Sequence, residues 1–262
     1  MPELPDVEML KRSFDATSLH RPIAEVDVRS DAIVERGSAG ELAGGLRGRS
    51  FEATRRHGKR LFAGLDEGGA LALHFGMTGS LRSFESTDDE PRHTRLLLRF
   101  ERGSHLALVM PRKLGKVGLV DDVDAFLEEQ RLGPDALSEA FDDAVFDAAL
   151  AGRRGSVKAA LMNQRLMAGI GNVYSDEILF QAGLHPRTEV PALDADSRRR
   201  LFDTLRWVLC TAVDHGADPA ELEGSFLLAH RSEGASCPRC DGAIRRIEVS
   251  GRGVYYCPAC QT

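Results

Sequence analysis

Short runs of alternating or apolar residues fill the first half of the chain and predict β-strands. The runs cover 23–28, 60–65, 70–74, 94–100, 106–110 and 117–120. Glycine-rich or charged turns separate them. Strands this short and this closely spaced favour a β-sandwich or barrel over a parallel sheet. A helix over 5–16 is predicted before them, because Val7, Leu10 and Phe14 share one helical face.

The pattern becomes helical in the second half of the chain. The helix candidates are 136–151, 158–161, 173–182 and 197–213. In the last one, apolar residues at helical spacing predict one buried stripe, formed by Leu201, Leu205, Val208, Leu209 and Ala212. Cys210 lies inside this apolar pattern and is predicted to be a core residue. Gly133 and Pro134 mark a plausible domain boundary between the two halves.

Composition and charge narrow the class of protein. Apolar content of 42% and charged content of 28% are ordinary for a globular protein. No apolar run approaches the roughly 18 residues of a membrane span, and the charged start does not resemble a signal peptide, so a cytoplasmic location is expected. The net charge is −6, but the stretch 121–149 holds ten acidic side chains and one arginine, which leaves +3 for the rest. A basic face that binds a polyanion is therefore compatible with the acidic total.

Four of the five cysteines form a metal-binding pattern at the C-terminal end. Cys237 and Cys240 make one C-x2-C pair, Cys257 and Cys260 make the second, and sixteen residues separate the pairs. Without a secretory signal, this spacing indicates tetrahedral zinc rather than disulfides. The segment 242–256 between the pairs is predicted to be a β-hairpin. Because four thiolates fill the coordination sphere, one structural zinc ion is expected, with no open catalytic position.

The first eight residues, MPELPDVE, carry a candidate nucleophile. If Met1 is removed, Pro2 presents a secondary amine, and an α-amino group titrates near ~8 rather than the ~10.4 of lysine. Such an amine can attack a carbonyl carbon and form a Schiff base, and Glu3 could exchange protons at the same carbon. Alternatively, the prolines only shape a helix start, with Asp6 and Glu8 near its positive end. The octapeptide alone leaves both interpretations open.

Further motifs, spread along the chain, resemble one enzyme family. They are HGKRL at 57–61, HFGMTG at 74–79, PRKLG at 111–115, GIGNVY at 169–174 followed by Asp176 and Glu177, and GRGVYYCPACQ at 251–261. Together with MPELPDVE, they resemble the Fpg/Nei DNA glycosylase/AP lyases, with the formamidopyrimidine-DNA glycosylase branch most similar. The motifs follow the family order from the first residue to the last.

The resemblance implies an α+β multidomain fold. It implies a catalytic β-sandwich with a leading helix over 1–133, a helix–two-turn–helix domain over 134–228 and a zinc-finger β-hairpin over 229–262. Damaged double-stranded DNA would lie in the cleft between the domains, bound by a monomer that associates with the nucleoid. The implied activity is base excision repair: release of an oxidised base by cleavage of its N-glycosyl bond, then strand cleavage at the abasic site.

The resemblance also assigns roles to individual residues. Pro2 would attack the sugar C1′ and form an imine, and Glu3 would assist base release and sugar opening. Lys59 would act as an acid or base near the sugar and phosphate. Arg252 would bind flanking phosphates and support β- or β,δ-elimination. An implied set of DNA contacts includes Met77, Arg112 and Leu114 in the gap left by the flipped nucleotide, with His74, His93, Arg154, Lys158 and Asn172 around it.

The local sequence around Asn172 also supports a contact with phosphate. It follows Gly169 and Gly171 at a helix start, and such a turn can present N–H groups and a positive dipole to a phosphate. Seen without the family, Lys59 would be an ordinary solvated turn lysine, and Met77 and Leu114 would be core residues.

Three departures from the family pattern bear on specificity. Met110 occupies a position that is usually acidic, and Leu114 replaces the usual aromatic wedge. The segment 216–236 is shorter than usual in a region that includes the loop closing over 8-oxoguanine, which favours formamidopyrimidines or oxidised pyrimidines instead. Two rival functions are a DNA-damage binding protein without turnover and a zinc-ribbon protein that recruits other proteins. The joint presence of Pro2, Glu3, Lys59 and Arg252 favours the enzyme.

Overall fold

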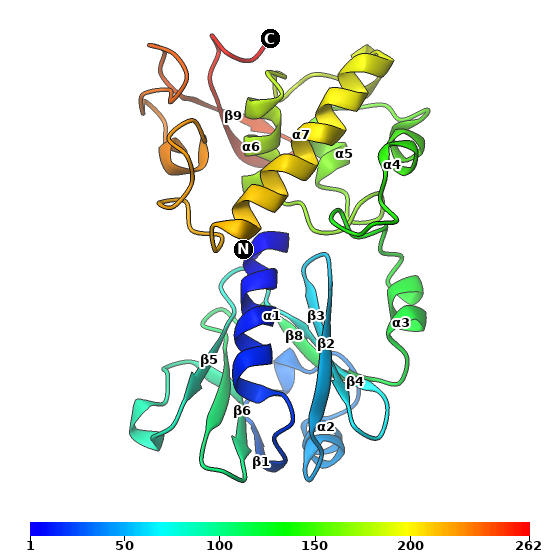
Figure 1. Cartoon of the computed structure of the whole chain (residues 1–262), viewed down its shortest axis with the longest axis vertical. Coiled ribbons are helices and arrows are strands. Elements are labelled where there is room, and N and C mark those ends of the chain that lie inside the picture. The colour runs from blue at the N-terminus through cyan, green and yellow to red at the C-terminus, as the bar shows by residue number, and fades with distance from the viewer. The chain divides into compact units, whose positions relative to one another are not determined.

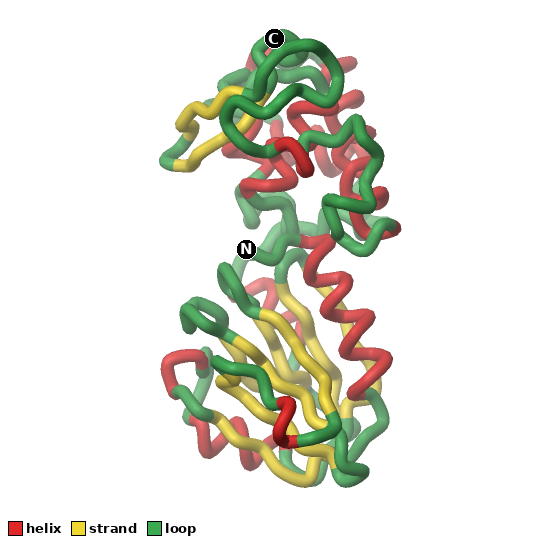
Figure 2. The backbone as a smooth tube through the Cα atoms, turned by 90° about the vertical axis from the view of Figure 1, so that its left-hand side faces the viewer, coloured by secondary structure: helices red, strands yellow, loops and turns green.

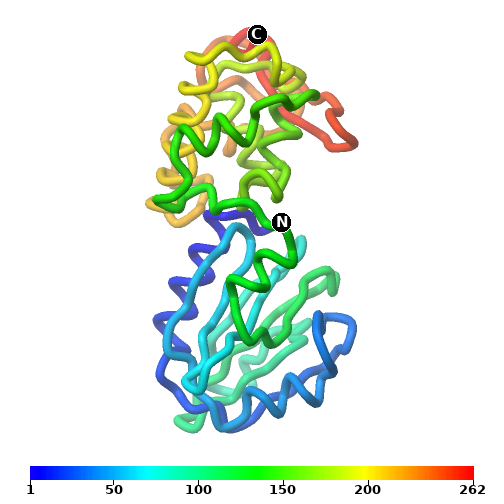
Figure 3. The backbone as a smooth tube through the Cα atoms, turned by 90° about the vertical axis from the view of Figure 1, so that its right-hand side faces the viewer, coloured from blue at the N-terminus to red at the C-terminus, as the bar shows by residue number.

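The computed structural model describes residues 1–262, which divide into two compact units. Unit 1 contains Met1–Pro2 and Asp6–Arg131, and unit 2 contains Glu3–Pro5 and Leu132–Thr262. Figure 3 follows the chain from its first residue to its last. None of the helices is long and apolar enough to span a bilayer. The predicted borders after 133 and 228 stay predictions, since the zinc hairpin groups with the helices in unit 2.

Unit 1 is built from two four-stranded antiparallel sheets, drawn as yellow tubes in Figure 2. One sheet has the order β1 (Ile23–Val28), β6 (Thr94–Phe100), β7 (His105–Val109) and β5 (Ser80–Phe84). The other has the order β2 (Phe51–His57), β3 (Arg60–Leu65), β4 (Ala70–His74) and β8 (Lys116–Val120). Leucines of both sheets share one core, among them Leu61 and Leu73 from one and Leu98 and Leu108 from the other. The predicted β-sandwich is therefore confirmed.

Two edge strands were not predicted from the sequence. β2 and β5 each lie at the end of a sheet, and each buries one residue, Phe51 or Leu81. With little apolar alternation, such strands resemble polar loops. The short helices α2 (Ala39–Leu46) and α3 (Val123–Glu129) were also missed, although Ser38 and Glu41 form a capping box at α2 and Asp122 caps α3.

The predicted first helix is confirmed as α1 (Leu4–Ser18). Val7 and Phe14 are fully buried, and the Phe14 ring meets the Phe51 ring edge to face with centroids 5.0 Å apart. The remaining ordered turns are four short 3-10 helices. They are η1 (Asp31–Ile33), η2 (Thr87–Asp89), η3 (Val190–Ala192) and η4 (Leu228–His230).

Unit 2 is helical, with α4 (Asp143–Leu150), α5 (Val157–Leu161), α6 (Asn172–Gln181) and α7 (Ala195–Asp214). Residues 174–180 of α6 are all buried, and α7 packs on α6 (Figure 1). The predicted helix over 136–151 is wrong in its first half. Asp142 accepts from the Val145 N–H and starts the helix there, whereas Asp135 accepts from the Leu137 N–H in a turn.

The predicted stripe of α7 is buried, but the prediction for Cys210 is wrong. Leu201, Leu205, Val208, Leu209 and Ala212 are fully inaccessible, while Cys210 is exposed. Successive residues turn by about 100° around a helix. Cys210 is therefore rotated away from Leu209 and shares the outer face with the exposed Trp207, three positions earlier.

The C-terminal hairpin consists of β9 (Arg245–Val249) and β10 (Arg252–Tyr256), as the sequence predicted. Ser250 and Gly251 both have positive φ, +51° and +71°, which is the two-residue turn that matches the twist of paired strands. Arg252 is exposed at this turn, directly opposite Val249. Behind the strands, Ile244 and two cysteines pack against Phe180 of α6.

Candidate active site

The carboxylate of Glu3 is anchored at the N-terminus of α6. Its Oε2 accepts from the N–H groups of Gly171 at 2.6 Å and Tyr174 at 3.2 Å, and its Oε1 accepts from the Val173 N–H at 2.9 Å. The side chain is buried in unit 2. A helix N-terminus favours a negative charge, so the first turn of α6 stabilises this carboxylate in one orientation.

The same contacts change the prediction for the glycine-rich turn. The N–H groups expected to meet a phosphate are occupied by Glu3. Asn172 uses its Nδ2 to donate to the carbonyl of Gly253 at 3.0 Å, while its Oδ1 is buried without a hydrogen-bond partner. Asn172 therefore connects α6 to the residue that follows Arg252, and its predicted contact with DNA stays a prediction.

Lys158 lies inside unit 2 instead of at its surface. Its ammonium donates to Asp176 Oδ1 at 2.6 Å, to Ser175 Oγ at 2.6 Å and to the Asn172 carbonyl at 3.2 Å. The side chain has no exposed area, and burial lowers the pKa of Lys158, opposed by the carboxylate of Asp176. In this conformation the ammonium is not available to DNA. Arg154 is exposed, as its predicted contact requires.

In unit 1, Lys59 occupies a two-residue turn between β2 and β3. His57 pairs with Arg60, and Gly58 has a φ of +55°, a conformation that glycine adopts without strain. Lys59 and Pro2 are both half-buried and belong to the same unit. Glu3 and Arg252 belong to unit 2, so the four predicted catalytic residues are divided equally between the units.

His74 ends β4 and lies opposite Arg60 in the sheet. Burial, reinforced by the positive charge of Arg60, lowers the pKa of His74 to about 4, so its imidazole is neutral near pH 7. The Gly76 N–H points at Nδ1 from 3.4 Å, which assigns the proton to Nε2. His74 can therefore donate a hydrogen bond to a phosphate oxygen without carrying a charge.

The turns that bear Met77 and Leu114 touch each other through their backbones. A Cβ added at Gly76, whose φ is +59°, would lie 2.5 Å from the carbonyl carbon of Leu114 and from the nitrogen of Gly115. Met77 is 44% exposed and Leu114 50%, among only four exposed large apolar side chains. Unit 1 thus presents two of the three predicted gap-filling side chains from adjoining turns, and Arg112 is exposed on the same turn as Leu114.

The turn that carries Arg112 rests on Met110 and Arg95. Met110 is buried, and its Cε lies only 2.4 Å from where a Gly115 Cβ would be. Arg95 Nε donates to the Met110 carbonyl at 3.1 Å, and the Met110 N–H donates to the carbonyl of the exposed His93 at 3.0 Å. The apolar side chain of Met110 therefore supports this turn, at a position noted above as usually acidic in the family pattern.

The four predicted zinc ligands converge in unit 2. Their sulfur atoms all lie within 4.8 Å of one another, with Cys237–Cys260 at 3.8 Å and Cys240–Cys257 at 3.6 Å. A tetrahedron with Zn–S bonds of about 2.3 Å has edges of about 3.8 Å, whereas a disulfide would need about 2.05 Å. The cysteines form one structural zinc site that closes the base of the hairpin bearing Arg252.

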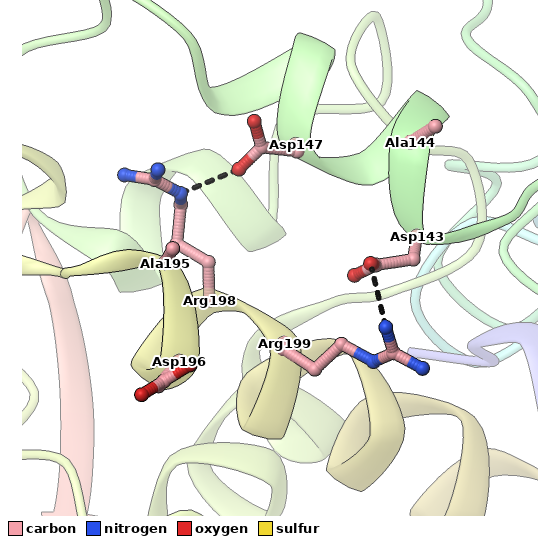
Figure 4. Close-up of a pocket in the computed structure, with 7 residues that line it drawn as sticks. All are labelled: Asp143, Ala144, Asp147, Ala195, Asp196, Arg198 and Arg199. Atoms are coloured by element: carbon pink, nitrogen blue, oxygen red, sulfur yellow. Dashed lines mark hydrogen bonds and ion pairs between the residues drawn. The ribbon is translucent and has the colours of Figure 1, made fainter.

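A hollow of about 520 Å³ between α4 and α7 contains none of the predicted site residues. Figure 4 shows its lining, Asp143, Ala144, Asp147, Ala195, Asp196, Arg198 and Arg199. Asp147 pairs with Arg198 and Asp143 with Arg199, on partly exposed side chains. The hollow is a surface feature in which two aspartates and two arginines are paired.

The sequence assigned no role to the buried Asp176 or to the half-buried Arg231. Asp176 and Arg231 form an ion pair, with Arg231 Nη2 2.8 Å from Asp176 Oδ2. A signal for Asp176 existed, because Asp176 and Glu177 interrupt an otherwise apolar helical run, and charges in such a run must be buried with partners. The partner Arg231 lies 55 positions away and could not be identified from spacing.

A leading helix on a β-sandwich, a helical unit that anchors Glu3, and a four-cysteine hairpin define a zinc-containing DNA glycosylase of the helix–two-turn–helix class. Family models agree along the chain. Residues 1–117 match the formamidopyrimidine-DNA glycosylase N-terminal domain, residues 132–223 its H2TH domain, and residues 236–262 the zinc finger found in FPG and IleRS. The chain belongs to the formamidopyrimidine-DNA glycosylase family, and it is a DNA glycosylase with AP lyase activity.

Relatives cover the chain from end to end. The formamidopyrimidine-DNA glycosylases of Desulfitobacterium hafniense and Paracoccus denitrificans are 33% and 36% identical, each over 100% of both chains. A crystal structure of the Lactococcus lactis enzyme bound to DNA with an AP site matches with a TM-score of 0.90, 28% identity and 99% coverage of both chains. The same enzyme with DNA containing N7-benzyl-Fapy-dG matches with a TM-score of 0.90, 28% identity and 100% coverage.

Proposed function

We propose that the chain removes ring-opened, oxidised bases from duplex DNA with Pro2 as nucleophile, Glu3 as proton-transfer group, and Lys59 and Arg252 as supports for strand cleavage. The observation that carries the proposal is the anchoring of Glu3 by three N–H groups of α6. This fixed carboxylate directly follows Pro2 in the chain. A nucleophile joined to a positioned acid or base is the arrangement that covalent catalysis requires.

The proposed reaction begins after removal of Met1. The Pro2 nitrogen forms a bond to C1′ as the bond from C1′ to the base breaks, and the base leaves with a proton. Protonation of the sugar ring oxygen, assisted by Glu3, opens the ring to an iminium ion. The iminium acidifies the C2′ hydrogen, whose loss expels the 3′ phosphate; a second elimination can expel the 5′ phosphate.

The proposed DNA contacts come from exposed turns of unit 1, from His74 at the end of β4 and from Arg154 of unit 2. Met77 and Leu114 would fill the space left by the flipped nucleotide, and Arg112 would hydrogen-bond the unpaired base. His74, His93 and Arg154 would contact phosphates and fix the register without reading sequence. We further expect a monomer that acts on DNA in the cytoplasm.

The lesion that we propose is a formamidopyrimidine rather than 8-oxoguanine. The relatives carry this name, and the L. lactis enzyme has been solved with Fapy-dG-type DNA. The segment 216–236 supports the choice of a formamidopyrimidine because side chains of α6 bind this segment through hydrogen bonds. Gln181 donates to the Ser225 carbonyl at 3.1 Å, and Glu177 accepts from the N–H groups of Leu227 and Leu228. A short, fixed segment is poorly suited to close over 8-oxoguanine.

Borohydride trapping on an abasic duplex tests the nucleophile. Protein whose Met1 removal has been verified by mass spectrometry should form a covalent adduct, and Pro2→Gly should greatly reduce it. The matched control is the wild-type chain with an uncleaved N-terminal tag, which keeps Pro2 but blocks its nitrogen. Absence of an adduct from the processed wild-type protein would contradict the proposal.

A panel of single-lesion duplexes tests the substrate. Under single-turnover conditions, formamidopyrimidine release should exceed 8-oxoguanine release by about tenfold or more, equivalent to about 1.4 kcal/mol in the barrier. Equal rates would reject the lesion preference and leave the trapping result untouched.

A further inference from the structure

Asp176 is a buried carboxylate that joins three separate elements of unit 2. Its Oδ1 accepts from Lys158 of α5 at 2.6 Å. Its Oδ2 accepts from Arg231 Nε at 2.8 Å and from the Tyr255 N–H of β10 at 3.2 Å. The side chain has no exposed area, so none of these bonds competes with water.

The contact at Tyr255 fixes the hairpin on two sides. The Arg231 guanidinium that pairs with Asp176 also lies over the Tyr255 ring, with its carbon 4.8 Å from the centroid. A second bond joins Asn172 Nδ2 to the Gly253 carbonyl. β10 is therefore held by α6 at two backbone positions, one and three residues beyond Arg252.

The same helix holds Glu3. The first turn of α6 binds the Glu3 carboxylate, and Asp176, four residues after Asn172, lies on the next turn. Within one compact unit, α6 therefore holds both Glu3 and the strand that carries Arg252. A shift of β10 along α6 would change the position of the guanidinium without moving the carboxylate.

A contribution to stability does not by itself explain why these charges are buried. Removing two ions from water costs several kcal/mol each, and apolar replacements of buried ion pairs are often neutral or stabilising. Directional bonds to a backbone N–H and to a guanidinium instead specify one position of the hairpin.

We propose that Asp176, with Lys158 and Arg231, is a positioning residue that sets the hairpin carrying Arg252 against α6 and thereby controls strand cleavage more than imine formation. The inference rests on the proposed roles of Glu3 and Arg252. It assigns Asp176 no contact with the reacting atoms.

The test compares two steps on one abasic duplex, borohydride trapping and strand cleavage, in the full-length zinc-loaded protein. In Asp176→Asn, cleavage should fall by about tenfold or more while trapping changes little, because small displacements of a positioned group cost large factors in rate. Adding Asp176→Asn to Arg252→Gln should lower cleavage no further, since the first acts through the second.

Glu177→Gln is the matched control. Glu177 is the neighbouring buried carboxylate, but it binds Leu227, Leu228 and Gln181 instead of β10. Its variant should preserve the ratio of cleavage to trapping. Arg231→Gln provides a second variant that retains the Lys158–Asp176 pair, and it carries the same expectation as Asp176→Asn if the latter fails to fold.

Equal slowing of trapping and cleavage in both Asp176→Asn and Arg231→Gln would overturn the positioning role. Additive loss with Arg252→Gln would overturn it as well. Failure of the wild-type protein to form any adduct rejects the proposed function itself, so the two failures are distinguishable.

Discussion

Unit 1 and unit 2 bury different kinds of side chain. The core of unit 1 is apolar, and its buried polar residues are Ser18, Thr94, Ser104 and His105. Unit 2 buries carboxylates and an ammonium, namely Glu3, Asp135, Lys158, Asp176 and Glu177. The helical unit is organised by directional polar bonds, whereas the sandwich is organised by packing.

This difference determines whether a mutation in the interior of each unit alters stability alone or stability and activity together. In unit 1, four candidate site residues lie on turns outside the apolar core, namely Lys59, Met77, Arg112 and Leu114. A core defect is therefore expected to lower stability without redirecting Lys59 or Met77. In unit 2, the groups that hold Glu3 and the hairpin form part of the buried interior. Damage there is expected to alter stability and chemistry together.

Loss of zinc should have the largest effect on structure and activity. It should affect unit 2 and leave the strands of unit 1 unchanged. Structural zinc contributes an apparent ~10–16 kcal/mol in small zinc-binding domains, so Cys240→Ser should abolish ordering of the hairpin and cleavage of abasic DNA. Hydrogen exchange should show lost protection in β9 and β10, with unit 1 strands unchanged. Protected β10 amides in zinc-free protein would contradict this expectation.

A core truncation in unit 1 is the converse experiment. Leu98→Ala in β6 should destabilise unit 1 by about 2–5 kcal/mol, because the leucine is 1% exposed and leaves a cavity. Denaturant unfolding measures the loss. Cleavage per folded molecule and zinc content should remain at the wild-type level; a changed ratio of cleavage to trapping would show that the units are not separable.

His74 makes the stability of unit 1 depend on pH. Its pKa is about 4 when folded against 6.5 for the ordinary group, so the unfolded chain binds more protons between these values. Stability should therefore fall as pH drops from about 6.5 to 4, by up to about 3 kcal/mol. His74→Gln should flatten this decline in unfolding measurements across pH, and His20→Gln, at an exposed histidine of the same unit, should not.

The smallest effect is expected at the charged hollow of unit 2. Asp143→Asn breaks a pair with Arg199 in which both side chains are exposed, 42% and 67%. Exposed pairs contribute little, so the free energy of unfolding should change by less than about 0.5 kcal/mol. A larger loss would show that charge matters in unit 2 beyond its buried network.

The sequence predicts the sandwich well and its borders less well. Six predicted runs correspond to β1, β3, β4, β6, β7 and β8, because each of these strands buries two or more residues and is recognised by its apolar positions. The edge strands β2 and β5, which bury one residue each, and the start of α4 depend on neighbours and caps that a periodic pattern does not contain. Cys210 shows the same limit, since an apolar run does not specify which side of a helix a single residue occupies.

The sequence likewise predicts some features of the candidate site and not others. The zinc ligands could be predicted because two short spacings determine the metal geometry. The anchoring of Glu3 could not, since its donors lie 168 to 171 positions away in the chain. The burial of Lys158 was equally hidden, because its partners Asp176 and Asn172 come together with it only in the folded unit.

The two methionines beside the Leu114 turn differ in their exposure to oxidants. Met110 is 1% exposed and packs against Gly115, whereas Met77 is 44% exposed. Reactive oxygen species that generate damaged bases also convert accessible methionine to its sulfoxide, which is polar and chiral. The repair protein therefore carries a redox-sensitive side chain in its proposed wedge, and sulfoxide reductases would restore that side chain.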